Sequence, residues 1–316
     1  MHPFRFGVVL ESIRGLLDLQ DIAARAEDAG FNTLLIRDHL VDAPFGAQLA
    51  PLTTLAVAAT LSTTLRLGTL VIDNDFRHPA VLAKEIATLD LLSAGRVELG
   101  LGAGWLANEY EQSGISFDPP GTRIERLAES IAILKKLLAA EPATFHGKHY
   151  RIDGLRSFPA SLQRPHPPIL LGGGARRMLS LAGREADIVS VLTSNVTSGA
   201  LRDDPAERSP DRVAEKVGWI RDAAGDRFPR IELSLFPDFV VTDDRRSAAA
   251  AIAAARGWTA LAPEAVLAMP AMLIGDLSQI VDLLQQRRET LGFSYFVIGD
   301  ADLEAVAPIV SRLANT

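Results

Sequence analysis

The sequence contains no cysteine. This absence excludes disulfide bonds, thiolate nucleophiles and cysteine-ligated metal sites, and it leaves the redox compartment open, with the cytoplasm as the default expectation. Lysine is also scarce. Its five residues all fall in expected helices or in an expected hairpin, rather than directly after a strand. A Schiff-base aldolase would therefore lack its nucleophile.

Patterns that mark several other classes of protein are missing as well. There is no HExxH sequence and no HxH after the first expected strand, so a histidine-built metal site is not expected. No stretch approaches about 18 uninterrupted apolar residues, and the first short apolar run is followed by Glu11, so we expect neither a membrane span nor a signal peptide. The net charge of −7, without any run of basic residues, argues against a nucleic-acid-binding surface.

A strand–helix–strand unit between Arg66 and Trp105 shows how the chain is organised. Residues 67–72 form a short apolar run, as expected of a parallel strand that is covered on both faces. Pro79 then opens a helix with apolar residues at helical spacing. The next strand, residues 97–101, leads into a glycine-rich turn, where the backbone can bend sharply and a ligand can approach it closely.

The same unit recurs along the chain. Eight expected strands alternate with helices, at residues 4–10, 33–37, 67–72, 97–101, 168–171, 188–192, 231–236 and 295–298. Right-handed crossovers allow a closed parallel barrel or a doubly wound sheet, and the barrel is favoured because no GxGxxG fingerprint follows the first strand. We therefore predict one α/β domain over residues 1–316, a (β/α)8 TIM barrel with insertions at about residues 142–166 and 237–275.

Asp38 and His39 directly follow the second expected strand. In a TIM barrel the residues just past each strand face one site, so this position favours a functional role. An ordinary histidine has a pKa of about 6.5, which suits proton exchange, and Asp38 would then set the tautomer of His39 or bind a ligand. The same pair would also fit a helix N-cap or a loop, and the sequence alone leaves both interpretations open.

Two glycine-rich turns follow later strands. Residues 172–174 are all glycine and precede a helix start, where free backbone N–H groups would suit an anionic phosphate. Arg176 and Arg177 add positive charge there, although a flexible joint with solvated arginines would give the same pattern. The turn at residues 100–104 fits either a ligand platform or tight loop closure, and residue 105, a tryptophan, excludes a dinucleotide fingerprint.

Over nearly its whole length the sequence resembles the luciferase-like monooxygenases, and among them the branch that uses the 5-deazaflavin coenzyme F420. The resemblance is carried by FGVVL near the start, RDHL after the second strand, the long stretch LGTLVIDNDFRHPAVLAKEIATLDLLSAGRVELGLGAGW, QRPHPPILLGGG, and the closing MLIG and FSYFVIG. It implies a (β/α)8 barrel with insertions, in proteins that are commonly dimers or larger oligomers.

The resemblance also implies roles for individual residues. His39 corresponds to the proton-donating histidine of the deazaflavin-dependent dehydrogenases, and Leu70–Val71 to a bulge, often with a non-proline cis peptide, that supports the deazaflavin ring from behind. The other implied cofactor contacts are Asp38, Asp73, Ala103, Gly104 and Asn108, with a phosphate cradle at Gly173, Gly174, Ala175, Arg176, Arg177 and Met178. One departure is Trp105, which stands where the family's sugar-phosphate dehydrogenases have a catalytic glutamate, and their substrate-phosphate lysines are not evident.

We therefore predict an F420-dependent oxidoreductase that moves a hydride between the deazaflavin and a small, apolar organic substrate. Trp105, Phe76 and Trp258 are expected to line the substrate pocket, with Ser12 and Val41 near its mouth. Alternatively, Trp258 and the neighbouring methionines would only seal the insertion against the barrel.

Three other functions stay open at this point. The first is an FMN-dependent monooxygenase on the same scaffold, and the second is a non-catalytic deazaflavin-binding protein. The third is a metal-dependent barrel enzyme built on the acidic residues near strand ends, which are Glu11, Asp38, Asp73 and Asp300. For the main prediction we expect a cytoplasmic homodimer with a small-molecule substrate, no resident metal and neither nucleic-acid nor membrane partners.

Overall fold

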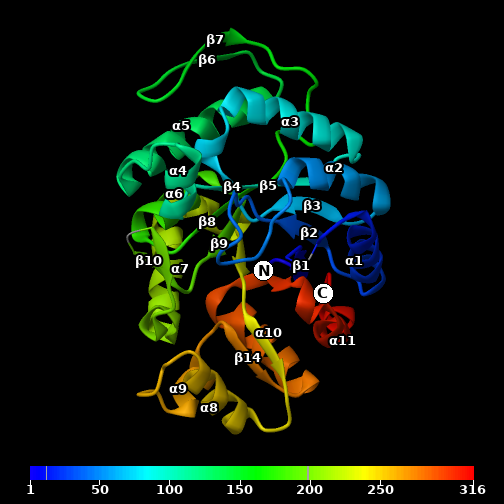
Figure 1. Cartoon of the computed structure of the whole chain (residues 1–316), viewed down its shortest axis with the longest axis vertical. Coiled ribbons are helices and arrows are strands. Elements are labelled where there is room, and N and C mark those ends of the chain that lie inside the picture. The colour runs from blue at the N-terminus through cyan, green and yellow to red at the C-terminus, as the bar shows by residue number, and fades with distance from the viewer. Residues whose placement is uncertain (12, 198) are drawn as a thin grey trace.

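The computed structural model of the chain describes residues 1–11, 13–197 and 199–316. Its centre is a ring of eight parallel strands, β1 (Arg5–Val9), β2 (Thr33–Ile36), β3 (Arg66–Thr69), β5 (Val97–Gly102), β8 (Ile169–Gly173), β9 (Ile188–Val191), β12 (Glu232–Leu235) and β15 (Phe293–Gly299). Strand β1 pairs with both β2 and β15, and the pairing of β3 with β5 closes the ring. The predicted (β/α)8 barrel is confirmed (Figure 1).

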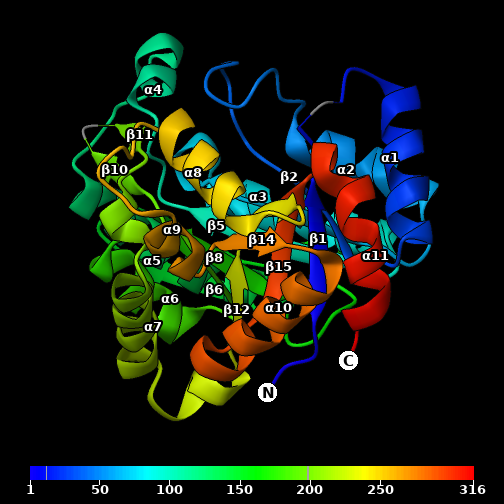
Figure 2. The ribbon, with the colours of Figure 1, turned by 90° about the horizontal axis from the view of Figure 1, so that it is seen from below.

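Helices surround the strands, as Figures 1 and 2 show. They are α1 (Leu16–Asp28), α2 (Pro51–Leu61), α3 (Pro79–Leu92), α5 (Pro120–Leu138), α6 (Arg176–Glu185), α7 (Pro210–Ala224), α10 (Leu277–Leu291) and α11 (Leu303–Leu313). Four of them begin with proline, whose missing N–H is not needed in the first helical turn. Helix α10 begins instead with a capping box, in which Asp276 and Gln279 satisfy each other's backbone N–H groups.

The third expected strand is interrupted. Strand β3 ends at Thr69, and pairing with β5 resumes only in the two-residue strand β4 (Ile72–Asp73). Between them lie Leu70 and Val71, which are joined by a cis peptide bond. The bulge that the family resemblance implied is therefore present.

Two insertions leave the barrel. The first is an antiparallel hairpin of β6 (Ala143–His146) and β7 (Arg151–Leu155), at the top of Figure 1. The second contains β13 (Asp238–Val241), α8 (Arg245–Ala255), α9 (Pro263–Ala268) and β14 (Met272–Gly275). Strands β13 and β14 form their own two-stranded parallel sheet, and the unit lies at the bottom of Figure 1 with a separate hydrophobic core.

Short elements complete the chain. They are the helix α4 (Ala107–Ser113), the strands β10 (Asn195–Thr197) and β11 (Ala200–Arg202), and the 3-10 turns η1 (Asn74–Phe76), η2 (Pro205–Arg208), η3 (Gly225–Arg230) and η4 (Asp300–Asp302). Helix α4 and the β10–β11 hairpin follow barrel strands β5 and β9, so both lie at the end of the barrel where active sites form.

The interior of the barrel is filled, so it is a packed core rather than a pore. Leu35 and Tyr295 occupy its centre because the facing positions are glycines. A Cβ atom on Gly7 would lie 2.8 Å from Cδ1 of Leu35, and one on Gly68 would lie 2.5 Å from Cδ2 of the same side chain. This layer separates the two ends of the barrel.

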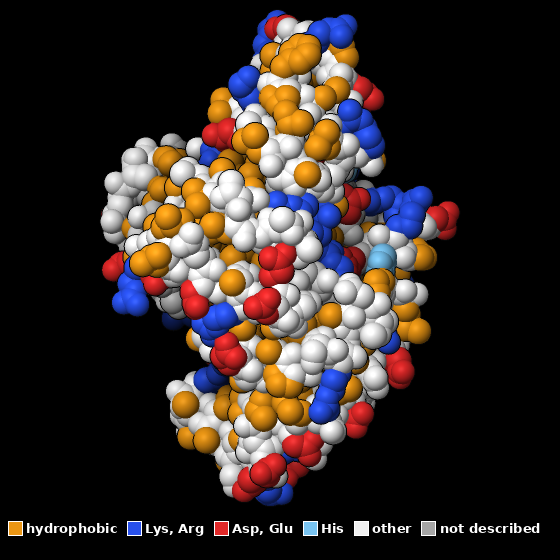
Figure 3. All heavy atoms as spheres, turned by 90° about the vertical axis from the view of Figure 1, so that its right-hand side faces the viewer, with side chains coloured by type: hydrophobic (Ala, Val, Ile, Leu, Met, Phe, Trp, Pro, Cys, Tyr) orange, Lys and Arg blue, Asp and Glu red, His pale blue; other side chains and the backbone are white. Residues whose placement is uncertain are grey.

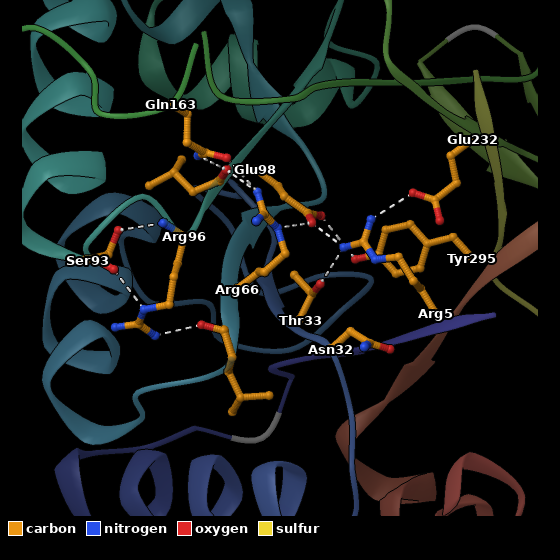
Figure 4. Close-up of polar contacts among 12 residues, drawn as sticks. Arg5, Asn32, Thr33, Arg66, Ser93, Arg96, Glu98, Gln163, Glu232 and Tyr295 are labelled. Carbon is orange, nitrogen blue, oxygen red and sulfur yellow. Dashed lines mark hydrogen bonds and ion pairs between the residues drawn. The ribbon is translucent and has the colours of Figure 1, made fainter. Parts of the chain in front are cut away.

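A buried ionic network closes the end of the barrel at which the strands begin (Figure 4). Glu98, which is 1% exposed, pairs with Arg5 and Arg66. Arg5 also pairs with Glu232 at 2.7 Å, and its guanidinium lies 4.4 Å from the ring centre of Tyr295. Because this end carries few ligand-facing loops in TIM barrels, we interpret the network as structural.

Candidate active site

The loops that follow the barrel strands enclose a cavity of about 1020 Å³. Its wall includes residues from the ends of β2, β3, β5, β8, β9 and β12, as expected for a TIM-barrel site. Of the predicted site residues, those in the wall are Asp38, His39, Leu70, Val71, Asp73, Ala103, Gly104, Trp105, Gly173, Gly174, Ala175, Arg176 and Met178. The space is at the upper end of typical ligand pockets and would hold a flat cofactor together with a small substrate.

His39 is held by a residue that sequence reasoning missed. Its Nδ1 lies 3.0 and 3.1 Å from the two carboxylate oxygens of Glu109, which is 2% exposed and also lines the cavity. The His39 ring packs 5.1 Å from the ring of Phe45 and 5.9 Å from that of Trp105. The available signal was position, because Glu109 stands in the first turn of a helix that begins at the barrel mouth.

Asp38 does not contact the ring nitrogen of His39 in this way. Its carboxylate pairs with Arg77 and accepts a hydrogen bond of 3.2 Å from the backbone N–H of Asp73. The contact that would set the tautomer of His39 is therefore made by Glu109 and not by Asp38. Asp38 still lines the cavity, and its role as a cofactor contact stays a prediction.

Asp73 is a buried carboxyl group at the cavity wall. It accepts hydrogen bonds from the Tyr110 hydroxyl at 2.9 and 3.1 Å and from the backbone N–H of Asp75 at 2.9 Å. Burial raises the pKa of Asp73 to about 7, and the carboxylates of Asp75 and Asp38 act in the same direction, against those hydrogen bonds. Arg77 and Arg126 pair with Asp38 and Asp75 respectively, so Asp73 is the member of this acidic group without an ion pair among the described residues.

The start of α6 has the features of an anion site. Its N-cap residue Ala175 makes no side-chain capping hydrogen bond, so the first backbone N–H groups lack a side-chain acceptor. A Cβ atom on Gly174 would lie 3.0 Å from the carbonyl oxygen of Leu192, so any larger residue would be crowded there. Arg176 lines the cavity and forms no ion pair with another residue that the structure describes. These groups fit a phosphate.

Four predicted site residues lie outside the cavity wall. Arg177 pairs with Glu125 at 2.9 Å, and Asn108 faces solvent, where it accepts a hydrogen bond from Gln112. The other two are Phe76, which packs against the ring of Tyr110, and Trp258. Val41 also lies off the wall, and Ser12 falls outside the described residues.

Trp258 belongs to the core of the second insertion, which corrects the expectation that it lines the substrate pocket. It is 5% exposed and packs among the alanines and methionines of that unit, because α8 and α9 bury their apolar faces there. Its indole N–H donates to the backbone carbonyl of Asp203 at 3.1 Å. The position of Trp258 agrees with the alternative interpretation, in which its side chain packs within the insertion.

The cavity wall near β10 and α7 contains cations that are already neutralised. Arg208 pairs with Asp203 at 2.7 Å, and Arg212 pairs with Glu207 at 3.1 Å. Behind them Lys216, with no exposed surface, pairs with the same Glu207 at 2.8 Å. A substrate phosphate would have to displace these carboxylates before it could bind here.

Within the described ranges, no group of three or more His, Asp or Glu side chains is placed to hold a metal ion. Nor does any described helix have the length and apolar character needed to cross a membrane.

A sequence profile of the luciferase-like monooxygenases matches residues 1–291. The chain belongs to this family. It is 30% identical over 240 residues to the F420-dependent glucose-6-phosphate dehydrogenase of Microbacterium testaceum (strain StLB037), an alignment that covers 75% of this chain and 70% of that relative. It is 35% identical over 191 residues to the enzyme of the same name from Nakamurella multipartita, covering 58% of this chain and 55% of that relative.

Solved structures support the fold. An F420-dependent secondary alcohol dehydrogenase in complex with an F420–acetone adduct superimposes with a TM-score of 0.76 at 18% identity, over 99% of this chain and 98% of that one. At this identity the likeness concerns the fold alone, which agrees with the barrel described above.

Proposed function

We propose that this member of the luciferase-like family is an F420-dependent oxidoreductase that moves a hydride between the coenzyme and a small, uncharged organic substrate. One observation carries the proposal. A histidine held through Nδ1, a wall of glycine and apolar residues, and an anion site at a helix start meet in one cavity. The F420-dependent relatives support the same assignment.

The residues present fit the coenzyme. Leu70 and Val71 form one wall together with the turn at residues 102–104, and this wall would lie against a flat ring. The α6 start, with Gly174 and Arg176, would hold the phosphate. When bound, the 5-deazaflavin supplies the hydride chemistry.

The chain's own contribution to the reaction would be made around His39. Nδ1 of His39 is occupied by Glu109, so Nε2 is the nitrogen that would take the hydroxyl proton of an alcohol as hydride leaves the adjacent carbon. In the reverse direction Nε2 would return that proton to a carbonyl oxygen. Phe45 and Trp105 pack around the ring and would keep water away from this proton.

The substrate is proposed to be uncharged and largely apolar. Aromatic side chains line the cavity beside His39, namely Phe45, Trp105, Phe117 and Phe236. The cations near α7 are paired with carboxylates, so an anionic substrate would incur a desolvation cost without a free partner there. We expect secondary alcohols, ketones or enones to be better substrates than sugar phosphates.

Titration of the purified protein with F420 and with FMN tests the cofactor assignment. We expect saturable binding of F420, at least about tenfold tighter than that of FMN. A panel of alcohols, ketones and sugar phosphates then tests turnover. Tight FMN binding with oxygen consumption would favour a monooxygenase, and F420 binding without turnover of any member would favour a carrier.

We also propose that the protein forms a homodimer through α2 and α3. Helix α2 has no charged residue among its eleven, and Val57 is exposed on it. The neighbouring helix α3 exposes Val81, Leu91 and Leu92. Figure 3 shows hydrophobic side chains gathered over the upper half of the face on this side of the molecule. A second copy of this surface would bury these apolar side chains, and the exposed Lys84 and Glu85 of α3 have opposite signs, so they can pair across such an interface.

A further inference from the structure

Glu109 makes contacts that go beyond a single hydrogen bond to His39. Oε1 of Glu109 also accepts the backbone N–H of Leu40 at 2.6 Å and, more weakly, that of Val41 at 3.4 Å. Both carboxylate oxygens lie at nearly equal distances from Nδ1 of His39. This arrangement is expected where the carboxylate is the acceptor and each of the facing nitrogens carries a hydrogen.

The position of Glu109 is itself fixed. The next residue, Tyr110, has no exposed surface, and its hydroxyl donates a hydrogen bond to the carboxylate of Asp73, the last residue of β4. At the start of α4, the backbone N–H of Ala107 donates to the carbonyl oxygen of Gly199 at 3.1 Å. These contacts hold the backbone of α4 where the Glu109 side chain reaches His39.

The His39 ring is confined on the other sides. Phe45 and Trp105 contact it, and their own rings lie 6.2 Å apart in an edge-to-face arrangement. Nε2 has no hydrogen-bond partner among the residues that the structure describes. The ring thus has one nitrogen bound to protein and one left for a ligand in the cavity.

We propose that Glu109 is the positioning residue of this site, which holds His39 in the form with hydrogen on Nδ1 and so makes Nε2 the atom that exchanges the proton with substrate. This inference rests on the proposed function. A buried carboxylate that accepts from one ring nitrogen determines which tautomer the neutral ring adopts. It also stabilises the imidazolium that forms when Nε2 takes a proton.

Glu109→Gln separates this role from packing. The glutamine has the same size, but its amide can present either an oxygen or an NH2 group to Nδ1, so the tautomer is no longer specified. Glu109→Asp keeps the charge on a shorter side chain and should restore part of the effect. Glu111→Gln is the matched control, because Glu111 is exposed on the same helix.

Long-range 1H–15N spectra of 15N-histidine-labelled protein measure the tautomer without coenzyme or substrate. The chain has six histidines, and His39→Gln identifies the signal of His39. At about pH 8.5, where an ordinary histidine is neutral, we expect the parent and Glu111→Gln to show hydrogen on Nδ1 of His39. Glu109→Gln should show a mixture of tautomers or hydrogen on Nε2. An unchanged spectrum in folded Glu109→Gln would overturn the proposal, and so would hydrogen on Nε2 in the parent.

Turnover gives a second measurement, with F420 and a substrate that the panel identifies. We expect Glu109→Gln to lower kcat by at least about tenfold, to leave KM and F420 affinity within about threefold, and to be partly rescued in Glu109→Asp. Impaired His39→Gln with fully active Glu109→Gln would refute the role of Glu109 alone. Unimpaired His39→Gln would instead refute the proposed function of His39.

Discussion

Gly174 shows how a single missing side chain prepares the proposed phosphate site. A Cβ atom there would meet the carbonyl oxygens of Leu192 at 3.0 Å and Ser194 at 3.3 Å. Glycine therefore lets the α6 start approach β9 closely while its backbone N–H groups stay open to a ligand. Gly104 serves differently, because its absent side chain makes room for the Tyr110 hydroxyl, at 1.8 Å from a Cβ atom placed there.

Gly174→Asp should weaken F420 binding at least about tenfold, because it places a carboxylate against the phosphate and crowds the neighbouring carbonyl groups. Gly15→Asp adds the same charge where a Cβ atom would meet nothing within 4 Å, and it should bind F420 like the parent. Fluorescence titration of both variants makes the comparison. Equal affinity of folded Gly174→Asp and the parent would show that the phosphate lies elsewhere.

Helix α4, with only seven residues, supports two titratable groups of the cavity at once. Glu109 reaches His39, and the adjacent Tyr110 reaches Asp73. Because consecutive helical residues point about 100° apart, the two contacts lie on different sides of the helix and fix its rotation. A change at either residue should therefore be felt at both groups.

Asp73 gives the coenzyme-free protein a pH-dependent stability. The pKa of Asp73 is about 7 in the folded chain and near the ordinary aspartate value of 3.8 when the chain is unfolded, so between these values only the unfolded chain releases the proton. The contribution of neutral Asp73 to the free energy of unfolding is thus complete below about pH 4 and is lost as pH rises through about 7.

The variant Asp73→Asn removes this dependence, because asparagine cannot ionise. Its stability relative to the parent should rise by a few kcal/mol between about pH 4 and 8 and then level off. Urea unfolding across this range measures the difference, and parallel curves for the two proteins would contradict the assignment.

Several elements could be predicted to the residue because their ends carry explicit signals. Pro51, Pro79 and Pro210 mark the first residues of α2, α3 and α7. Helix α5 carries the same signal, because it begins at Pro120. The break between β3 and β4 has no such marker, since its residues are apolar and β-forming, and only the family resemblance indicated it.

Part of the candidate site was predictable from the order of strands and helices. Residues that directly follow strands, such as His39 and Gly174, could be placed at the mouth by topology alone. Glu109 could not, because its direction depends on how α4 is rotated by Tyr110. The sequence could not show whether Trp258 lines the pocket or lies in the core of the insertion, since an apolar run fits both positions.

At the scale of the whole barrel, an ionic network closes the end at which the strands begin. Glu98 is buried in it and is the shared partner of the partly exposed Arg5 and Arg66. Glu98→Gln should lower the free energy of unfolding by about 1–3 kcal/mol, because Arg5 and Arg66 lose their shared charged partner while Arg5 keeps its ion pair with Glu232. F420 affinity of the folded protein should be unchanged, since none of these charged residues lines the cavity. A stability loss below about 1 kcal/mol would show that the network adds little.

Lysine substitutions on α2 and α3 test whether these helices form the proposed dimer interface. The double variant Val57→Lys, Leu92→Lys places cations on both helices and should convert a dimer into monomers in sedimentation experiments. Val241→Lys is the control, because Val241 is similarly exposed but lies on β13. A monomeric parent, or a double variant that stays dimeric, would contradict the proposed interface.

The second insertion has a consequence for how specificity could change in this family. Strands β13 and β14 pair only with each other within the described chain, and the unit has its own apolar core. Yet it begins at Asp238, in the cavity wall, and its Arg256 pairs with that residue at 2.6 Å. Residues 238–275 thus form a cassette that evolution or an engineer could exchange without altering a hydrogen bond between barrel strands, while changing the cavity wall at Asp238.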